Sequence, residues 1–219
     1  MDVASLDRLI AGSRGDWPED VVHATRDPKE KHLSLYPTEE AAIVGANTRR
    51  RLEFAAGRSA ARAVLKKLGF PHGVIPMDQN RAPIWPAGTI GSLSHTADVC
   101  IGVAALSQHV QAIGIDVENL APLESKLPPY ITDPEELACI DSPPGLAALQ
   151  IFSMKEAAYK AQYPLSQTFI DFDTLKVTPD GLCFNHTVPP FAKGTILPVQ
   201  QWTGSSMCLS LCVLKRRPT

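Results

Sequence analysis

Two acidic residues, Asp116 and Glu118, stand at the end of the apolar run that covers residues 112–117. Side chains at alternate positions of a β-strand point to the same face, so both carboxylates would project together while Ile115 and Val117 pack on the other side. An acidic pair of this kind is most often a solvated pair at a strand edge. It indicates chemistry only if other charged groups converge on it.

A third acid, Glu156, shares one predicted helix face with four apolar or aromatic residues: Leu149, Phe152, Tyr159 and Tyr163. Their spacing of three and four positions is that of a helix, predicted over residues 146–163 and ended by Pro164. A carboxylate on a packing face needs a partner, because an unpaired buried charge is costly. A capping box from Ser153 to Glu156 would also explain this acid, but only if the helix began at Ser153.

Asp116, Glu118 and Glu156 offer only oxygen ligands, which suit a hard cation such as Mg²⁺ better than zinc. Protein-bound Mg²⁺ usually keeps waters and substrate phosphate oxygens as further ligands, so this set predicts a phosphate-bearing ligand. Lys160 lies one turn after Glu156 near the same helix face, whereas Lys155 lies about 100° round. Three acids and Lys160 would then share a cleft.

Basic residues that suit a phosphate occur in a helical pattern over residues 38–68. Arg51, Arg58 and Arg62 fall nearly in line, with Arg50 to one side. A planar guanidinium matches the geometry of a phosphate group. A solvated basic stripe is the alternative reading of the same pattern.

Ser94 and His95 end a predicted strand in the segment "GSLSHTAD". Backbone N–H groups and an imidazole donor at such a position would suit an anion. A histidine after a strand is, however, more often a structural residue.

The elements that position these residues alternate between helices and strands. One long helix or two in succession are expected over residues 38–68, with Thr38 as the N-cap and Gly69 after the last turn. Strands are expected over residues 89–93, 99–106 and 112–117, adjacent in one sheet, and over 175–177, 182–185 and 207–214. Between them, residues 121–145 hold six prolines, which predicts a connector with at most one short helix around residues 135–140. The order predicts an α+β protein with two similar halves, residues 1–111 and 112–219, in one compact unit.

Composition narrows the class of protein. The chain has 219 residues, of which 44% are hydrophobic and 20% charged, and a formal charge of -2, so neither nucleic acid nor a membrane surface is expected as its partner. The N-terminus has acids and no long apolar core, which argues against a signal peptide. Five cysteines without C-x-x-C spacing predict free thiols in the cytoplasm rather than a disulfide framework or a zinc site.

Taken together, four segments resemble the 4′-phosphopantetheinyl transferase superfamily, and within it the type of enterobactin synthase component D. They are "RRLEFAAGRSAARAVLKKLG" (50–69), "RAPIWPAGTIGSLSHT" (81–96), "GIDVE" (114–118) and "FSMKEAAYKAQYP" (152–164). The resemblance implies two pseudo-symmetric α+β halves with the active site and coenzyme A between them. It also implies transfer of the 4′-phosphopantetheine arm of coenzyme A to a serine of an apo carrier protein (acyl, aryl or peptidyl), with release of adenosine 3′,5′-bisphosphate.

The resemblance also assigns roles to residues. Asp116, Glu118 and Glu156 would hold Mg²⁺, or Mn²⁺, against the pyrophosphate of coenzyme A, and Glu156 would deprotonate the carrier serine. Lys160 would neutralise charge on the pyrophosphate and on the departing bisphosphate. The remaining assigned residues would bind coenzyme A, and they are Arg50, Arg58, Ser94, His95 and, in an assisting role, Lys155.

One departure from the family pattern concerns the loop before "WP". Many relatives have a lysine there, and this chain reads "DQNRAP", so the role passes to Arg81. The expected pathway is siderophore or other nonribosomal peptide or polyketide synthesis, with a monomeric enzyme. Two alternatives remain at this point: a non-catalytic relative that binds carrier proteins or coenzyme A, and a Mg²⁺-dependent nucleotide pyrophosphohydrolase.

Overall fold

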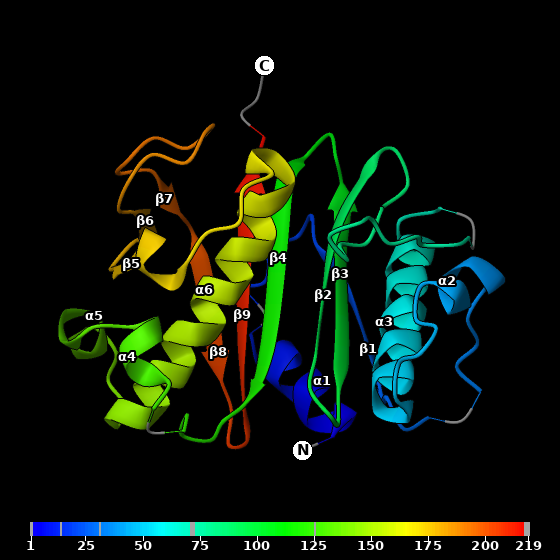
Figure 1. The fold of residues 1–219 in the computed structure, drawn as a ribbon, viewed down its shortest axis with the longest axis horizontal. Coiled ribbons are helices and arrows are strands. Elements are labelled where there is room, and N and C mark those ends of the chain that lie inside the picture. Colours follow the sequence, from blue (N-terminus) through cyan, green and yellow to red (C-terminus); the bar gives the residue numbers. More distant parts are fainter. Residues whose placement is uncertain (1, 14, 31, 71–72, 125, 217–219) are drawn as a thin grey trace. The chain divides into compact units, whose positions relative to one another are not determined.

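The computed structural model of the chain describes all residues except 1, 14, 31, 71–72, 125 and 217–219, and it has mixed α and β structure (Figure 1). The chain divides into two units. The first runs to Gln111 and also includes Arg216, and the second comprises Ala112–Lys215. Arg216 belongs to the first unit because its backbone N–H donates to the carbonyl of His109 at 2.9 Å and its Nε to that of Ser107 at 2.6 Å. The predicted α+β class is confirmed.

The first unit is a three-stranded antiparallel sheet with the long helix α3 packed on it (Figure 1). The strand order is β1-β3-β2. In chain order the elements are α1 (Val3–Gly12), β1 (Val22–Arg26), α2 (Pro37–Ala41), α3 (Thr48–Lys67), β2 (Thr89–His95) and β3 (Cys100–Leu106). The helix approaches β3 closely, because a Cβ built on Gly102 would lie 3.1–3.2 Å from Ala60. The small residues of α3 therefore set the distance between helix and sheet.

The helical pattern over residues 38–68 forms two helices, one of the two alternatives expected. Thr38 is not the N-cap, however: α2 begins at Pro37 and its N-cap is Tyr36. Proline is well suited to the first helical position, where its missing N–H costs nothing. Gly45, with a φ of 81°, lies between the two helices, and Asn47 caps α3 by accepting from the Arg50 N–H at 2.9 Å. Helix α1 and strand β1 were not predicted.

The second unit contains two sheets around the long helix α6. Their strand orders are β4-β9-β8 and β5-β6-β7. The helical elements are α4 (Pro128–Ile131), α5 (Pro134–Ala138), α6 (Pro144–Ser166) and the 3₁₀ turn η1 (Phe172–Thr174). The strands are β4 (Val110–Asn119), β5 (Leu175–Thr178), β6 (Gly181–Phe184), β7 (Ile196–Leu197), β8 (Val199–Thr203) and β9 (Met207–Lys215).

The expectation that residues 112–117 adjoin the strands at 89–93 and 99–106 in one sheet is wrong. Strands β2 and β3 are neighbours, but β4 lies beside β9. The reason is that β3 is already paired on one edge with β2 and on the other with β1, the strand that was not predicted. The nine-residue strand β9, which is largely buried, pairs with β4 instead.

The prolines of residues 121–145 start helices more often than predicted. Two short helices form, α4 and α5, each with proline in its first turn. Helix α6 also begins with a proline, and Pro164 lies inside it rather than ending it. The helix ends instead at Gln167, which has a φ of 53° and whose side chain donates to the carbonyls of Tyr163 and Pro164 at 3.3 and 3.2 Å.

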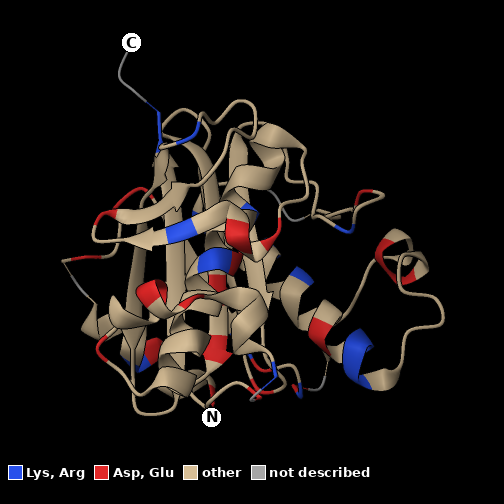
Figure 2. Cartoon of the chain, turned by 60° about the vertical axis from the view of Figure 1, so that its left-hand side comes forward, with Lys and Arg blue, Asp and Glu red and all other residues tan. Residues whose placement is uncertain are grey.

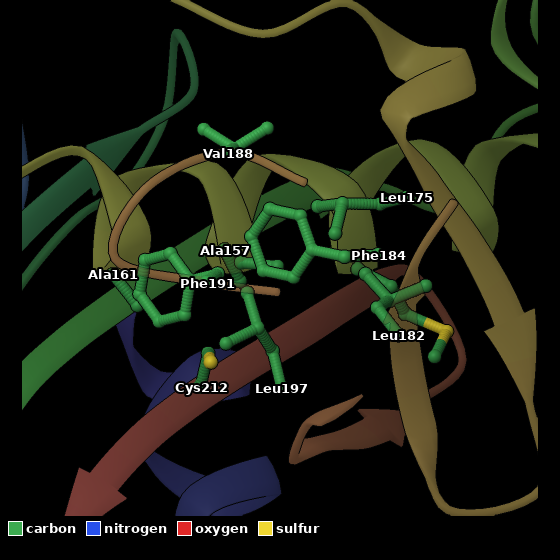
Figure 3. Packing of buried hydrophobic residues seen from close by; sticks show 11 residues of the cluster. Ala157, Ala161, Leu175, Leu182, Phe184, Val188, Phe191, Leu197 and Cys212 are labelled. Atoms are coloured by element: carbon green, nitrogen blue, oxygen red, sulfur yellow. The ribbon is translucent and has the colours of Figure 1, made fainter. Parts of the chain in front are cut away.

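Helix α6 packs through alanines and through the two ends of its predicted stripe, since Leu149 and Tyr163 are buried. Ala157 and Ala161 are fully buried and face a cluster that includes Phe184 and Phe191 (Figure 3). On the predicted stripe, by contrast, Glu156 and its neighbours Phe152 and Tyr159 are only half-buried. Small side chains allow the helix backbone to approach the sheet, which leaves the larger side chains at the edge of the contact.

All five cysteines are free. Burial raises the pKa of the Cys208 and Cys212 thiols to about 12, so both remain protonated at neutral pH. Among the described residues, no helix combines the length and the apolar character that crossing a membrane requires.

Candidate active site

Strand β4 and helix α6 touch at Gly114, and this contact positions the acidic residues. A Cβ built on Gly114 would lie 1.9 Å from the carbonyl oxygen of Ala157 and 2.7 Å from the backbone nitrogen of Ala161. No side chain fits in that space, so glycine is required for this approach. The residues that follow Gly114 on β4 are thereby held beside the turn of α6 that carries Glu156 and Lys160.

Lys160 links the helix to the strand. Its Nζ donates to Oδ1 of Asp116 at 2.7 Å and to the carbonyl of Ile115 at 3.1 Å. The side chain of Asp116 is 4% exposed and that of Lys160 is 26% exposed, so the pair lies at the boundary between protein and solvent. Lys160 therefore balances one of the acidic charges and remains accessible to a ligand.

The other two carboxylates carry charge that is less well compensated. Burial, together with the negative charges of Asp116 and Glu156, raises the pKa of Glu118 to about 7 against the opposing effect of Lys160. Burial also raises the pKa of Glu156, again opposed by Lys160 and reinforced by Asp116. At neutral pH the site thus holds more carboxylates than its one lysine balances, and it would take up a proton or a cation.

These residues fit a hard cation in donor type and in charge. The three acids lie near one another, because Asp116 and Glu156 both raise the pKa of Glu118 and Asp116 also raises that of Glu156. In the part of the chain that the structure describes, however, no three His, Cys, Asp or Glu side chains are arranged as a ready ligand set. A cation would have to draw the carboxylates together, and it would compete with Lys160 for Asp116.

Lys155 is not brought together with this group. Its side chain is 2% exposed, and its Nζ lies 2.8 Å from Oε1 of Glu136. It also donates to the carbonyls of Ile131 and Phe172, at 2.7 and 2.9 Å. Two lysines five positions apart on one helix therefore have different surroundings.

Arg58 is the most deeply buried of the predicted arginines, with only 3% of its surface exposed. Its guanidinium stacks over the ring of Phe54, 4.2 Å from the ring centroid. Burial lowers its pKa to about 10, and Glu39 partly opposes that effect. Among the described residues, nothing accepts a hydrogen bond from its Nε or Nη2. A buried cation with two N–H groups to offer is suited to an anionic ligand.

Arg50 and His95 contact each other, as expected of residues that bind one ligand. Nη1 of Arg50 lies 2.9 Å from Nε2 of His95. Because a guanidinium only donates, Nε2 accepts, and the ring proton is on Nδ1, 3.8 Å from Oε2 of Glu53. Glu53 is buried and also pairs with Arg49 at 2.8 Å. Ser94 is buried next to His95 at the end of β2.

The other arginines differ in their surroundings. Arg62 pairs with the buried Glu39 at 3.0 Å, and Arg51 is exposed. Arg81 is exposed in a loop with a φ of 68°, and its N–H donates to the carbonyl of Asp78 at 3.1 Å. Two buried acids that pair with arginines were not identified from the sequence: Glu39, which pairs with Arg62, and Glu53, which pairs with Arg49. Glu53 follows Arg49 by four positions on α3, a spacing that would have indicated the pair. Glu39 lies on another helix, so no spacing indicates its partner.

Over the described residues, acidic and basic positions are interspersed along the chain (Figure 2). The two charged groups are therefore local arrangements. They are the acidic group on β4 and α6 (Asp116, Glu118 and Glu156, with Lys160) and the basic group on α3 and β2 (Arg50 and Arg58, with His95).

Comparison with known proteins connects both groups to one family. Residues 38–105 match the model of the 4′-phosphopantetheinyl transferase N-terminal domain, and residues 112–188 match that of the 4′-phosphopantetheinyl transferase superfamily. The basic group lies within the first match and the acidic group within the second.

Curated relatives agree. The chain is 36% identical over 187 residues to 4′-phosphopantetheinyl transferase Svp of Streptomyces mobaraensis, which covers 80% of this chain and 74% of the relative. It is 33% identical over 165 residues to 4′-phosphopantetheinyl transferase PptT of Mycobacterium tuberculosis, covering 73% and 72%. It is 31% identical over 169 residues to enterobactin synthase component D of Salmonella typhi, covering 74% and 70%. The chain therefore belongs to the 4′-phosphopantetheinyl transferase superfamily, as an enzyme of the type of enterobactin synthase component D.

Proposed function

We propose that the acidic group on β4 and α6 is the reaction centre for transfer of 4′-phosphopantetheine from coenzyme A to a serine of an apo carrier protein. The observation that carries this proposal is the pairing of Lys160 with Asp116 beside Glu118 and Glu156, whose pKa values are raised. The group combines a candidate base, the ammonium of Lys160 and negative charge that this ammonium does not balance. Transfer of a phosphoryl-type group depends mainly on positioning and on such electrostatic stabilisation.

Glu156 is the proposed base. The carrier serine oxygen forms a bond to the phosphorus that bears pantetheine, and the bond from that phosphorus to the oxygen of adenosine 3′,5′-bisphosphate breaks. The serine proton passes to Glu156, directly or through a water. A raised pKa suits a carboxylate for this step, because it can hold the proton it accepts.

Lys160 is the proposed electrostatic partner of the leaving group. Its ammonium is partly exposed and already oriented by Asp116 and by the carbonyl of Ile115. From that position it would balance charge on the pyrophosphate and on the departing bisphosphate.

Asp116, Glu118 and Glu156 are the proposed ligands of a divalent cation, Mg²⁺ or alternatively Mn²⁺. Bound there, the cation would neutralise charge on the pyrophosphate oxygens. Support comes from the oxygen donor set and from the raised pKa of Glu118, since a cation relieves the excess of negative charge.

The basic group is the proposed site for the adenine nucleotide of coenzyme A and its 3′-phosphate. Arg58 supports this role because its buried Nε and Nη2 have no acceptor among the described residues. Arg50 and His95 are joined by a hydrogen bond and are partly exposed. Ser94 beside them and the exposed Arg81 complete the proposed contacts. Lys155 is left out, because its ammonium is buried among other partners.

The proposed setting is the cytoplasm, where coenzyme A and apo carriers are made, and five free cysteines agree with it. Siderophore or other nonribosomal peptide or polyketide synthesis is the proposed pathway, supported by the relatives named enterobactin synthase component D. The enzyme is proposed to act as a monomer.

The test is to incubate the enzyme with coenzyme A, Mg²⁺ and several apo carriers and to weigh each carrier by mass spectrometry. A gain of one phosphopantetheine, with one equivalent of bisphosphate released, is the expected result. No gain on any carrier would overturn the proposal. Bisphosphate released without a change in carrier mass would instead indicate a pyrophosphohydrolase.

A further inference from the structure

The buried ammonium of Lys155 joins parts of the second unit that are distant in sequence. It donates to the carbonyl of Ile131 at the end of α4, to the carbonyl of Phe172 in η1, and to Glu136 on α5. An ammonium has three N–H donors, so these three acceptors use all of them. The connector helices and η1 are thereby fixed to one point on α6.

Glu136 extends the same contact to strand β5. Its Oε1 accepts from the Val177 N–H at 3.0 Å, and its carboxylate lies 3.6 Å from the ammonium of Lys176. Lys176 also pairs with Asp133 at 2.8 Å, at the more exposed side of the cluster. Lys155 alone in this cluster donates to both the α4 and the η1 carbonyls among the described residues.

The segment held by Lys155 forms one wall of a cavity. The cavity has a volume of about 290 Å³ and is lined by residues of α6, including Glu156 and Tyr159, and by residues 169–172. Lys155 and Leu175 also line it, and most of the lining is apolar or aromatic. The proposed base therefore faces a space whose shape depends on residues 169–172.

We propose that Lys155 is a positioning residue, which fixes the wall of residues 169–172 against the cavity beside Glu156 and so sets how tightly the apo carrier engages. This role rests on the proposed function. Lys155 does not touch the reacting atoms in this role. Its three directional bonds orient the wall against the cavity.

A purely stabilising role predicts something different. Replacing both members of a buried ion pair with uncharged groups is often neutral for stability, whereas removing one member strands the other charge. The variant Lys155→Met would therefore unfold more easily. Combining it with Glu136→Gln removes both charges, keeps an acceptor for the Val177 N–H and should recover most of that stability. The two carbonyls would still lack their lysine donor.

The experiment compares wild type, the double variant Lys155→Met with Glu136→Gln, and the matched control Lys176→Met, which removes an ammonium that bonds neither carbonyl. In the double variant we expect amide hydrogen exchange in residues 128–131 and 169–172 to accelerate about tenfold or more, because local opening becomes easier. We expect KM for the apo carrier to rise about 10-fold or more with kcat nearly unchanged, since Glu156 stays on its helix. The control should match wild type in both measurements.

The proposal is overturned if the double variant exchanges and binds carrier like wild type, or if Lys176→Met changes both measurements equally. A uniform loss of activity that follows the folded fraction, with unchanged local exchange, would also overturn it. If the wild-type enzyme modified no carrier, the proposed function would fail, while local exchange would still decide whether Lys155 fixes this wall.

Discussion

The two long helices use the same packing and present different charged groups. Both α3 and α6 lie on their sheets through alanines, which allow a close approach. Helix α3 then presents a buried arginine, Arg58, with two N–H groups to offer, whereas α6 presents Glu156 next to other acids. A small packing face leaves large charged side chains at the edge of the contact, where they remain available to a ligand.

The comparison also distinguishes structural from functional charges. Lys155 and Lys160 lie on the same helix, but Lys155 is surrounded by protein acceptors while Lys160 is partly exposed beside Asp116. Burial alone therefore does not identify a catalytic charge. A combination of burial and uncompensated neighbouring charge is a better indicator, as at Glu118, whose pKa these two effects raise to about 7.

Removal of divalent cations should have the largest effect. It should act on the acidic group of β4 and α6. After treatment with a chelator, transfer should stop, because the pyrophosphate charge would face three carboxylates with only Lys160 to balance it. Carrier mass gain measures this, and added Mg²⁺ or Mn²⁺ should restore it. Full transfer in the chelator would remove the metal from the proposal.

Glu156→Gln should lower kcat by about 10²–10⁴-fold, the usual contribution of a general base. The amide keeps the shape of the carboxylate, so circular dichroism and the unfolding midpoint should be unchanged or slightly raised. The matched control is Glu135→Gln, at an exposed position on α5. Retained transfer in Glu156→Gln would assign the base elsewhere.

Arg58→Met tests the role of the basic group on α3 and β2 in binding coenzyme A. We expect KM for coenzyme A to rise about 10–100-fold, as is typical when hydrogen bonds to a charged group are lost, with little change in kcat. The unfolding free energy should not fall much, because the buried guanidinium lacks acceptors for Nε and Nη2 among the described residues. An equal loss of kcat and an unchanged KM would place Arg58 outside the nucleotide site.

Gly114→Ala should weaken the contact that places the acids of β4 beside α6. The new methyl group would overlap the backbone of Ala157, and overpacking of this kind costs about 1–3 kcal/mol of unfolding free energy. Urea unfolding measures the effect. Gly12→Ala is the control, since a Cβ there meets nothing within 4 Å. Equal stability of the two variants would mean that β4 and α6 are farther apart than described.

Arg49→Ala should have the smallest effect and defines the baseline for α3. The Arg49 side chain is 77% exposed, and its pair with Glu53 is worth at most about 1 kcal/mol. KM for coenzyme A should equal that of wild type. A rise as large as that of Arg58→Met would mean that general positive charge on α3, rather than one buried guanidinium, attracts the nucleotide.

The sequence predicted the helices and strands that have a strong period or a clear end, and it predicted the acidic residues of β4 and α6. It did not predict which strand adjoins β4, because that depends on β1, a short strand of mixed polarity that occupies the free edge of β3. Alternation of residues within a strand determines its buried face but not its neighbour.

The packing face of α6 was predicted only in part, at Leu149 and Tyr163, for a related reason. Periodicity favours the large side chains Phe152 and Tyr159, but the close approach at Gly114 selects alanines. Helix spacing places Lys160 near the face of Glu156 and Lys155 about 100° round from it, but it does not identify their partners. Their partners, Glu136 and Asp116, come from other elements, so only the tertiary structure assigns one lysine to each.

The path of the chain between the units has a consequence for assembly. The chain leaves the first unit after Gln111, builds the whole second unit, and returns to the first with Arg216, which bonds to Ser107 and His109. The two units are therefore joined by two covalent connections rather than one. During synthesis the hydrogen bonds of Arg216 in the first unit form only after the whole second unit has been made.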